Sequence, residues 1–314
     1  MAIFNRTIDW LLQPEDPTTR YFALRDLLDQ PETASDMKQA KQAIMRTGPV
    51  PKILAKQKRG GYWGIKEDFY IRAKYKGTVW NMILLAELGA DGRDPRVRET
   101  CEFVLNWSQD RKSGGFAYRG SSNGGNHSGI IPCLTGNMAW CLVRFGRLKD
   151  PRVQKALDWI VSYLRFDDGS GRPPRAWPYN RWEDCWGRHT CHMGIVKALK
   201  ALAAIPAAER TEQQKDVLKK GCEYLLRHHI HKRSHDLGRV SKPGWLKLGY
   251  PRMWDTDIIE ILDILTSLGY RDPWMKEALD VVCSKQDESG RWALEHTWND
   301  RFLVYIEKKG KPSK

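Results

Sequence analysis

The chain repeats one helical unit, and this repeat constrains its fold more than any other feature. Three segments share an Asp-Pro start followed by apolar residues at helical spacing: GRDPRVRETCEFVLNW (92–107), LKDPRVQKALDWIVSY (148–163) and YRDPWMKEALDVVCSK (270–285). An Asp before a Pro favours the start of a helix, because its side chain caps free backbone N–H groups and Pro fits the first helical position. We therefore expect N-caps at Asp94, Asp150 and Asp272, and a fourth helix of this kind near Thr211.

A second series of helical segments alternates with the first, and its members end close to Gly or another small residue. They are expected at 17–28, 77–89, 134–146, 191–203 and 257–269. Two helices per unit of roughly 55–65 residues is typical of repeat proteins. No convincing run of strand-forming residues interrupts the series. The sequence therefore predicts an all-α fold and a single domain over residues 1–314.

The linkers carry a shared motif. QKRGGYW (57–63) and QDESGRW (286–292) both read Gln, three residues, Gly, one residue, Trp. This pattern resembles the Gln-Trp motif of the squalene-cyclase and protein-prenyltransferase superfamily, and the resemblance covers nearly the whole chain. It implies an α/α toroid of about five to six pairs, with inner helices around a cavity and outer helices at the rim. It also implies a structural role for Gln57, Trp63, Gln286 and Trp292.

The spacing also predicts where the ring would end. A sixth inner helix would begin near residue 314, where the sequence stops. We therefore expect the final inner helix to be missing or the ring to have an open seam.

Composition narrows the class of protein. The formal charge is +14, but no nucleic-acid-binding motif accompanies it, which leaves a solvated basic surface or a basic mouth for a phosphorylated ligand. No apolar run approaches the roughly 18 residues of a membrane span, and the N-terminus lacks a secretory pattern. The seven cysteines are scattered through apolar helical segments, which favours reduced thiols. We expect a cytoplasmic protein with no nucleic-acid partner; peripheral membrane contact and oligomeric state stay open.

The repeat register brings metal-binding residue types together. Aligning the inner helices on their terminal small residues places five side chains at one depth: Cys133, His189, Cys191, Asp255 and Asp257. Thiolate, imidazole and carboxylate are the ligands that zinc takes in proteins. The alternative is a polar, hydrogen-bonded helix start with buried thiols. In either case we expect Cys185 and His192 to pack nearby.

Two of these positions carry a resemblance to a zinc site. HTC (189–191) resembles the stretch with the zinc-binding His in the β subunits of protein prenyltransferases, and CLTGNM (133–138) lies where their zinc-binding Cys opens an inner helix. The resemblance implies zinc at Cys133 and His189. Those enzymes place an Asp two residues before the Cys, whereas this chain has Ile131. Asp257 or Cys191 would therefore have to complete the ligand set.

The string WDTDII (254–259) indicates a different chemistry. It resembles the Asp-x-Asp-Asp motif of class II terpene cyclases, with Asp255 and Asp257 at the first two acidic positions and Ile258 at the last. The resemblance implies that Asp257 is an acid that protonates an alkene. Two close carboxylates in a dry site could hold a proton at neutral pH. Capping of a helix by either Asp is the alternative.

Basic and aromatic residues near the inner-helix starts suit an apolar ligand that carries a diphosphate. Lysine and arginine bind phosphate, and aromatic faces stabilise cations. The candidates are Lys74, Lys76, Arg188, Arg252, Trp80, Trp140, Trp186 and Trp254. A solvated surface and helix packing would explain the same residues.

Together these resemblances imply an isoprenoid-handling toroid, either a prenyltransferase-like enzyme or a class II terpene cyclase-like enzyme. The transfer version would use zinc at Cys133 and His189, and the cyclisation version would use Asp257 without a metal. A non-catalytic ligand-binding or interaction module and a carbohydrate-active α/α barrel remain alternatives.

Overall fold

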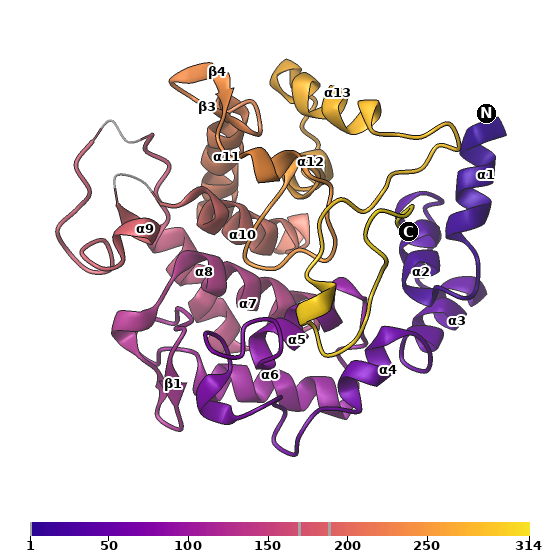
Figure 1. The fold of residues 1–314 in the computed structure, drawn as a ribbon. Helices are drawn as coiled ribbons and strands as arrows, with labels where there is room; N and C mark the ends of the chain where they lie inside the picture. Colours follow the sequence, from indigo (N-terminus) through magenta and orange to yellow (C-terminus); the bar gives the residue numbers. More distant parts are fainter. Residues whose placement is uncertain (1, 169–170, 188–189) are drawn as a thin grey trace.

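The structure is a computed structural model that describes the chain except for residues 1, 169–170 and 188–189. Its helices alternate between an inner and an outer row along a curved path (Figure 1). Within the described residues the strands are few and short, so the predicted all-α fold is confirmed.

The inner row is formed by helices that bury most of their surface. The side chains of α5 and α7 are nearly all buried, because each helix has neighbours in both rows. The inner helices are α2 (Pro17–Asp26), α5 (Thr78–Glu87), α7 (Pro132–Arg144), α10 (His192–Ala203) and α12 (Ile258–Ser267). Each lies within a few residues of its predicted span.

The outer row consists of amphipathic helices that bury one face. They are α6 (Pro95–Trp107), α8 (Pro151–Tyr163), α11 (Glu212–Arg227) and α13 (Lys276–Ser284). The Asp94 and Asp150 side chains accept backbone hydrogen bonds at the starts of α6 and α8, and Thr211 forms a capping box with Gln214. Asp272 caps a 3₁₀ turn directly before α13, so the four predicted helix starts are confirmed, the last through this extra turn.

The remaining elements are short or lie at the N-terminus. The helices are α1 (Ala2–Leu11), α3 (Ser35–Ile44), α4 (Pro49–Leu54) and α9 (Glu183–Trp186). Two antiparallel hairpins pair β1 (Gly120–Ser121) with β2 (Gly124–Gly125), and β3 (Lys232–Arg233) with β4 (Asp236–Val240). The 3₁₀ turns are η1 (Lys66–Asp68), η2 (His127–Gly129), η3 (Ala207–Glu209), η4 (Pro243–Leu246), η5 (Pro273–Met275) and η6 (Asn299–Arg301). The hairpins were not predicted, because such short strands leave no alternating pattern.

The Gln-Trp motif connects loops to helices. Gln57 Nε2 donates hydrogen bonds to the Arg96 carbonyl (2.8 Å) and to Thr100 Oγ1 (2.6 Å) on α6. Trp63 is fully buried and donates to the Ile53 carbonyl at 2.9 Å. In the second copy Gln286 donates to Gly290 and Trp292 donates to Val282. Gln57, Trp63 and Trp292 thus tie loops to helices, as predicted. Gln286 instead donates within its own loop.

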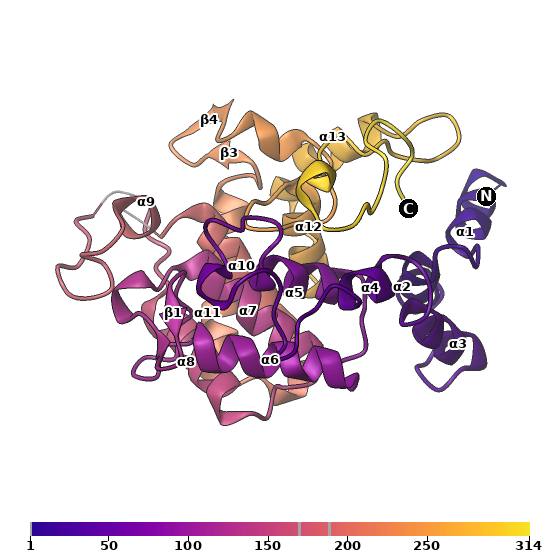
Figure 2. The same cartoon turned by 60° about the horizontal axis from the view of Figure 1, so that its bottom comes forward.

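The C-terminal segment joins the two ends of the curved path without a helix. It runs from α13 across to α1 and α2 as irregular chain (Figures 1 and 2). Lys314 Nζ donates to Gln13 Oε1 at 2.8 Å, and the Arg291 guanidinium lies 4.0 Å from the centre of the Trp10 ring. Among the described residues, none of the helices has the length and apolar character required to cross a membrane.

Candidate functional site

Two glycines allow α7 and α10 to touch, and this contact creates the candidate site. A Cβ atom on Gly136 would lie 2.5 Å from the backbone nitrogen of Ala198, and one on Gly194 would lie 2.7 Å from Pro132. Contacts this short exclude any larger side chain without movement of a helix. The close approach brings the start of α7, with Cys133, next to the start of α10, with Cys191.

Three thiols gather where these helices begin. Cys191 is the N-cap of α10, and its sulfur accepts a hydrogen bond from the Gly194 N–H at 3.3 Å. Its own N–H donates to the Cys185 carbonyl at 3.0 Å, and the Cys185 thiol hydrogen-bonds to the Cys191 sulfur. Cys133 interacts electrostatically with Cys191 and shares a hydrogen bond with Tyr70. We call Tyr70, Cys133, Cys185 and Cys191 the thiol cluster.

The thiols of the cluster differ in acidity. The hydrogen bond from Cys185 lowers the pKa of Cys191 to about 7, despite its burial, and the Gly194 N–H adds to this effect. The same hydrogen bond, together with burial, raises the pKa of Cys185 well above its usual range. Burial, and then the proximity of Cys191, raise the pKa of Cys133 to about 12. Cys191 is therefore the thiol that ionises near neutral pH, and a thiolate is the nucleophilic form.

The predicted zinc set is not assembled by the described residues. Across the described part of the chain there is no group of three or more His, Cys, Asp or Glu side chains that could hold a metal ion. Cys133 and Cys191 do approach each other, but Asp257 is held elsewhere by Arg252. His189 and Arg188, the other predicted site residues of this region, lie outside the described residues. The described residues therefore do not fit a zinc ion by themselves.

Both carboxylate oxygens of Asp257 are engaged in structural contacts. It caps α12 by accepting the Glu260 N–H at 2.9 Å, accepts the Gly249 N–H at 3.2 Å, and pairs with Arg252. Its side chain is completely buried. Burial raises the pKa of Asp257 to about 6, against the opposing effect of Arg252. These contacts use both oxygens, which matches helix capping, the alternative to a catalytic acid.

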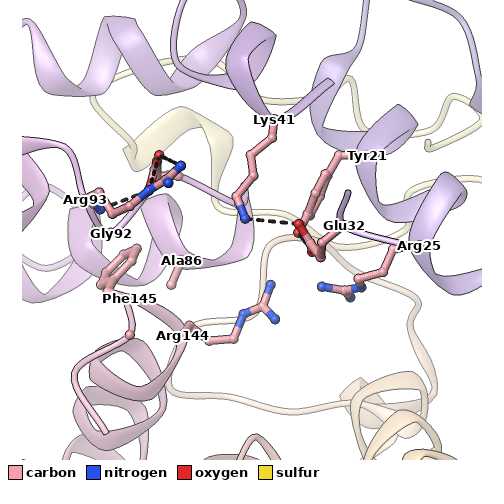
Figure 3. A pocket seen from close by; sticks show the side chains of 13 residues that line it. Tyr21, Arg25, Glu32, Lys41, Ala86, Gly92, Arg93, Arg144 and Phe145 are labelled. Atoms are coloured by element: carbon pink, nitrogen blue, oxygen red, sulfur yellow. Dashed lines mark hydrogen bonds and ion pairs between the residues drawn. The ribbon is translucent and has the colours of Figure 1, made fainter. Parts of the chain in front are cut away.

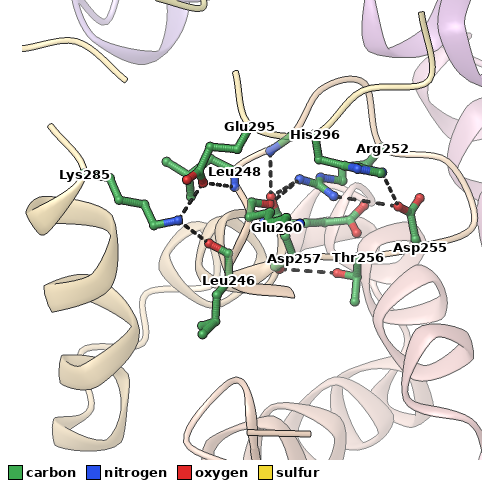
Figure 4. A network of polar contacts seen from close by, with 12 residues as sticks. Leu246, Leu248, Arg252, Asp255, Thr256, Asp257, Glu260, Lys285, Glu295 and His296 are labelled. Carbon is green, nitrogen blue, oxygen red and sulfur yellow. Dashed lines mark hydrogen bonds and ion pairs between the residues drawn. The ribbon is translucent and has the colours of Figure 1, made fainter. Parts of the chain in front are cut away.

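Asp255 has a more open environment. Its carboxylate lies 3.5 Å from His296 Nε2 and 3.9 Å from the Arg252 guanidinium (Figure 4). Its Oδ1 atom is buried and has no hydrogen-bond partner within the described residues. Burial lowers the pKa of His296, although Asp255 opposes this effect. Of the two predicted acids, Asp255 is the one with an oxygen left for a ligand.

The predicted cations separate into different roles. Lys74 and Lys76 are both exposed near the start of α5. The Lys74 ammonium lies 4.6 Å from the centre of the Trp254 ring, and partial burial lowers its pKa. Arg252 is buried and engaged with Asp257. Lys74 is therefore the predicted cation placed beside an aromatic face.

Three of the four predicted tryptophans belong to the core. Trp80 and Trp186 are buried; the first stacks on Tyr70 and the second packs edge-on against Trp159. Trp140 is buried beneath the Lys200 ammonium, which lies 4.0 Å from the centre of its ring. Trp254 is only partly buried and donates a hydrogen bond to the Tyr75 hydroxyl at 3.0 Å. Helix packing, the alternative to pocket lining, accounts for the first three.

The C-terminal segment covers this end of the inner helices. The Trp298 ring stacks on Tyr75 with 4.5 Å between the ring centres, and Phe302 packs edge-on against the same ring. The Tyr250 N–H donates to the His296 carbonyl at 3.2 Å, which ties the segment to the loop before α12. Segments distant in sequence thus meet over the helix starts.

A buried ionic layer lies deeper between the inner helices. Lys197 is fully buried, and its Nζ donates to both Glu260 oxygens at 2.7 Å. Lys200 donates to Glu87 at 2.5 Å and to Glu260 at 3.1 Å. Burial alone would raise the pKa of Glu260, but the two lysines bring it down to about 2. We call Glu87, Lys197, Lys200 and Glu260 the ionic layer.

Sequence reasoning missed several of these residues. Cys185 was expected only to pack, and Tyr70, Lys197, Glu260 and His296 were not expected at the site. The charges of Lys197 and Glu260 inside otherwise apolar helices were the available signal, because a buried charge needs a partner. His192 packs as expected, with its ring 4.5 Å from that of Trp245.

Comparisons with known proteins add little to this geometry. No family model matches the sequence, and no curated protein matches it. Among solved structures, the chain is similar to the type II terpene cyclase MstE from Scytonema in complex with its substrate, geranylgeranyl dihydroxybenzoate. The two are 13% identical over 77% of this chain and 78% of that chain, with a TM-score of 0.32. A likeness this distant carries no argument about this chain.

Proposed function

We propose that this chain carries out a prenyltransferase-like reaction on itself, in which the Cys191 thiolate accepts an isoprenoid group from a prenyl diphosphate. The observation that carries the proposal is the position of Cys191 at the start of α10, where Cys185 and the Gly194 N–H stabilise its ionised form. The Gln-Trp resemblance supplies the substrate class, because toroids with this motif handle isoprenoids.

The chemistry requires one displacement. The Cys191 sulfur attacks the first carbon of the prenyl chain, an S–C bond forms, and the C–O bond breaks with its electron pair on the departing diphosphate. Because the thiol has a pKa of about 7, much of it is already ionised at neutral pH and no base is needed. Lys242 interacts with Cys191 and Lys74 with Cys133, so these two cations are suited to the leaving group.

The cyclisation version has less support. It needs a protonated Asp257 facing an alkene, whereas that carboxylate caps α12 and pairs with Arg252. Asp255, beside His296, is the acid that would remain for proton transfer.

The test is incubation of the protein with geranyl diphosphate at pH 7.5, followed by intact mass spectrometry and peptide mapping. We expect one geranyl group on Cys191 and release of one diphosphate. Cys191→Ser should abolish the adduct, whereas Cys283→Ser, which changes an exposed cysteine on α13, should retain it. An adduct on Cys283, or none on the wild-type protein, would contradict the proposal.

A non-catalytic ligand-binding module is the second candidate. It is favoured by the stacking of Trp298 on Tyr75, which covers the starts of the inner helices. Saturable binding of geranyl diphosphate, without an adduct and without diphosphate release, would support this function over the first.

Zinc at Cys133, His189 and Cys191 stays a separate prediction. Elemental analysis of the purified protein tests it, with Cys133→Ala and His189→Ala as variants and Cys283→Ala as the matched control. Stoichiometric zinc that is lost in both variants and kept in the control would support the site.

A further inference from the structure

A polar pocket lies at the opposite end of the inner helices. It has a volume of about 350 Å³ and is lined by residues from the ends of α2, α5 and α7 and from α3 (Figure 3). On α7, Arg144 of the pocket lies 11 residues after Cys133, which is about 17 Å at the rise of an α-helix. The pocket therefore does not belong to the thiol cluster. Its size is that of a small-molecule site.

Cations outnumber carboxylates in this pocket. Four cationic side chains line it, against two carboxylates: Arg25, Lys41, Arg93 and Arg144, with Glu32 and Asp91. Lys41 pairs with Glu32 at 3.3 Å, and Arg93 pairs with Asp91 at 2.8 Å. Within each pair the opposite charges neutralise each other. Arg25 and Arg144 are therefore the two lining cations that have no carboxylate partner among the lining residues.

One aromatic ring holds both arginines. The guanidinium carbons of Arg25 and Arg144 lie 4.7 Å and 5.8 Å from the centre of the Phe22 ring. Figure 3 shows the two guanidinium groups pointing toward each other. Gly89 has a φ of +75°, a conformation that favours glycine, and a Cβ atom there would lie 3.3 Å from the Phe22 ring.

The two guanidinium groups are not equally neutralised. Arg25 pairs with the exposed Asp26 at 2.5 Å. Arg144 has no ion pair within the described residues, and loss of solvent and the nearby charge of Arg25 lower its pKa. Two adjacent positive charges repel each other unless an anion lies between them. Complementing the carbonyl end of α7 is the structural alternative for Arg144.

We propose that this pocket binds a small free molecule through a phosphate or diphosphate group held between Arg25 and Arg144. The planar fork of Arg144 matches two phosphate oxygens, and Arg25, whose Nε and Nη2 donate to Asp26, has Nη1 left for a further contact. A phosphate carries close to two negative charges at neutral pH. The cations that line the pocket outnumber its carboxylates by two, and Arg25 shares its charge with Asp26 beside the pocket, so the lining still favours an anionic group. The site is independent of the proposed transferase reaction, and its failure would leave that proposal intact.

The test is titration calorimetry with inorganic pyrophosphate at constant ionic strength, with succinate as the carboxylate comparison. We expect one pyrophosphate per chain and weaker binding of succinate. Charge-assisted hydrogen bonds contribute about 1.5–3 kcal/mol each, so Arg144→Gln and Arg25→Gln should each weaken binding by about tenfold or more. Arg239→Gln, which removes an exposed charge on β4, should change it less than about twofold.

Several outcomes would overturn the proposal. These are no pyrophosphate binding by the wild-type protein, equal weakening in the Arg239→Gln control, and equal binding of succinate. Co-sedimentation with phosphatidic acid vesicles in the absence of pyrophosphate binding would assign the arginines to a lipid surface instead. Thermal unfolding without ligand keeps the test interpretable, because Arg144→Gln should retain the wild-type unfolding temperature while its shift with pyrophosphate becomes smaller.

Discussion

The two ends of the inner helices are built differently, and linker length explains the difference. At the carbonyl ends of α5 and α7, residues 88–94 and 145–150 turn directly into the outer helices. At the N–H ends, the linkers are long: 108–131 before α7 and 228–257 before α12. Short turns border the charged pocket, whereas the linker 228–257 places Lys242 beside Cys191 of the thiol cluster. Long linkers in a compact domain are often functional, so the comparison indicates where chemistry is sited.

The largest change in unfolding free energy is expected in the ionic layer, which lies between the two ends of the inner helices. Glu260→Gln leaves Lys197 buried without its counter-ion, and breaking a buried pair costs about 3–5 kcal/mol of unfolding free energy. Urea denaturation at pH 7 measures the loss. The control is Asp280→Asn in the exposed pair with Lys276, which should cost less than about 1 kcal/mol. Similar losses in both variants would mean that the layer adds no more than a surface pair.

Acid should weaken the same layer. The pKa of Glu260 is about 2 in the folded chain, below its ordinary value, so its contribution is complete above about pH 4.5 and is lost as pH falls toward 2. We expect this residue to account for about 2 kcal/mol of the decrease between pH 6 and pH 3. Urea denaturation at the two pH values measures it, and Glu260→Gln should lack this part of the decrease. An equal decrease in the variant would assign the pH dependence to other groups.

Separating α7 from α10 should destabilise the end of the inner helices that carries the thiol cluster. Gly136→Ala places a methyl group 2.5 Å from the backbone of α10, so the helices must move apart at a cost of about 1–3 kcal/mol. Gly244→Ala is the matched control, because its added Cβ would have no neighbour within 4 Å. Chemical denaturation compares the two variants. Wild-type stability in Gly136→Ala would contradict the close contact.

Removing Cys185 should make Cys191 less acidic. Without the hydrogen bond from Cys185, the pKa of Cys191 should rise from about 7 toward the ordinary value of about 8.5. The rate of iodoacetamide alkylation at Cys191, followed by mass spectrometry across pH 6–9, should fall about tenfold at pH 7 in Cys185→Ala. Cys222→Ala, a buried cysteine on α11, should leave the profile unchanged.

The smallest change in unfolding free energy is expected at the charged pocket. The Arg93 side chain is 78% exposed in its pair with Asp91, so Arg93→Gln should leave the unfolding free energy at its wild-type value within experimental error. The same denaturation assay measures it. A loss as large as that of Glu260→Gln would remove the energetic contrast between the ionic layer and this end.

Much of the fold was predictable from sequence, because its signals are local. Asp94 and Asp150 cap helices through atoms two residues away, and Thr211 does so within one turn. The site was less predictable. That Asp257 would pair with Arg252, and Cys191 with Cys185, depends on loops whose paths follow no simple period. The repeat register correctly brought Cys133 toward Cys191, since it compares equivalent depths in neighbouring units.

The ionic layer also bears on which ligands could enter beside Cys191. Lys197 lies six residues along α10, which is about 9 Å at the rise of an α-helix. A hydrocarbon tail reaching that depth would meet two ammonium groups and two carboxylates in place of an apolar floor. For the transfer reaction proposed at Cys191, we therefore expect short prenyl chains to be accepted and long ones to be rejected.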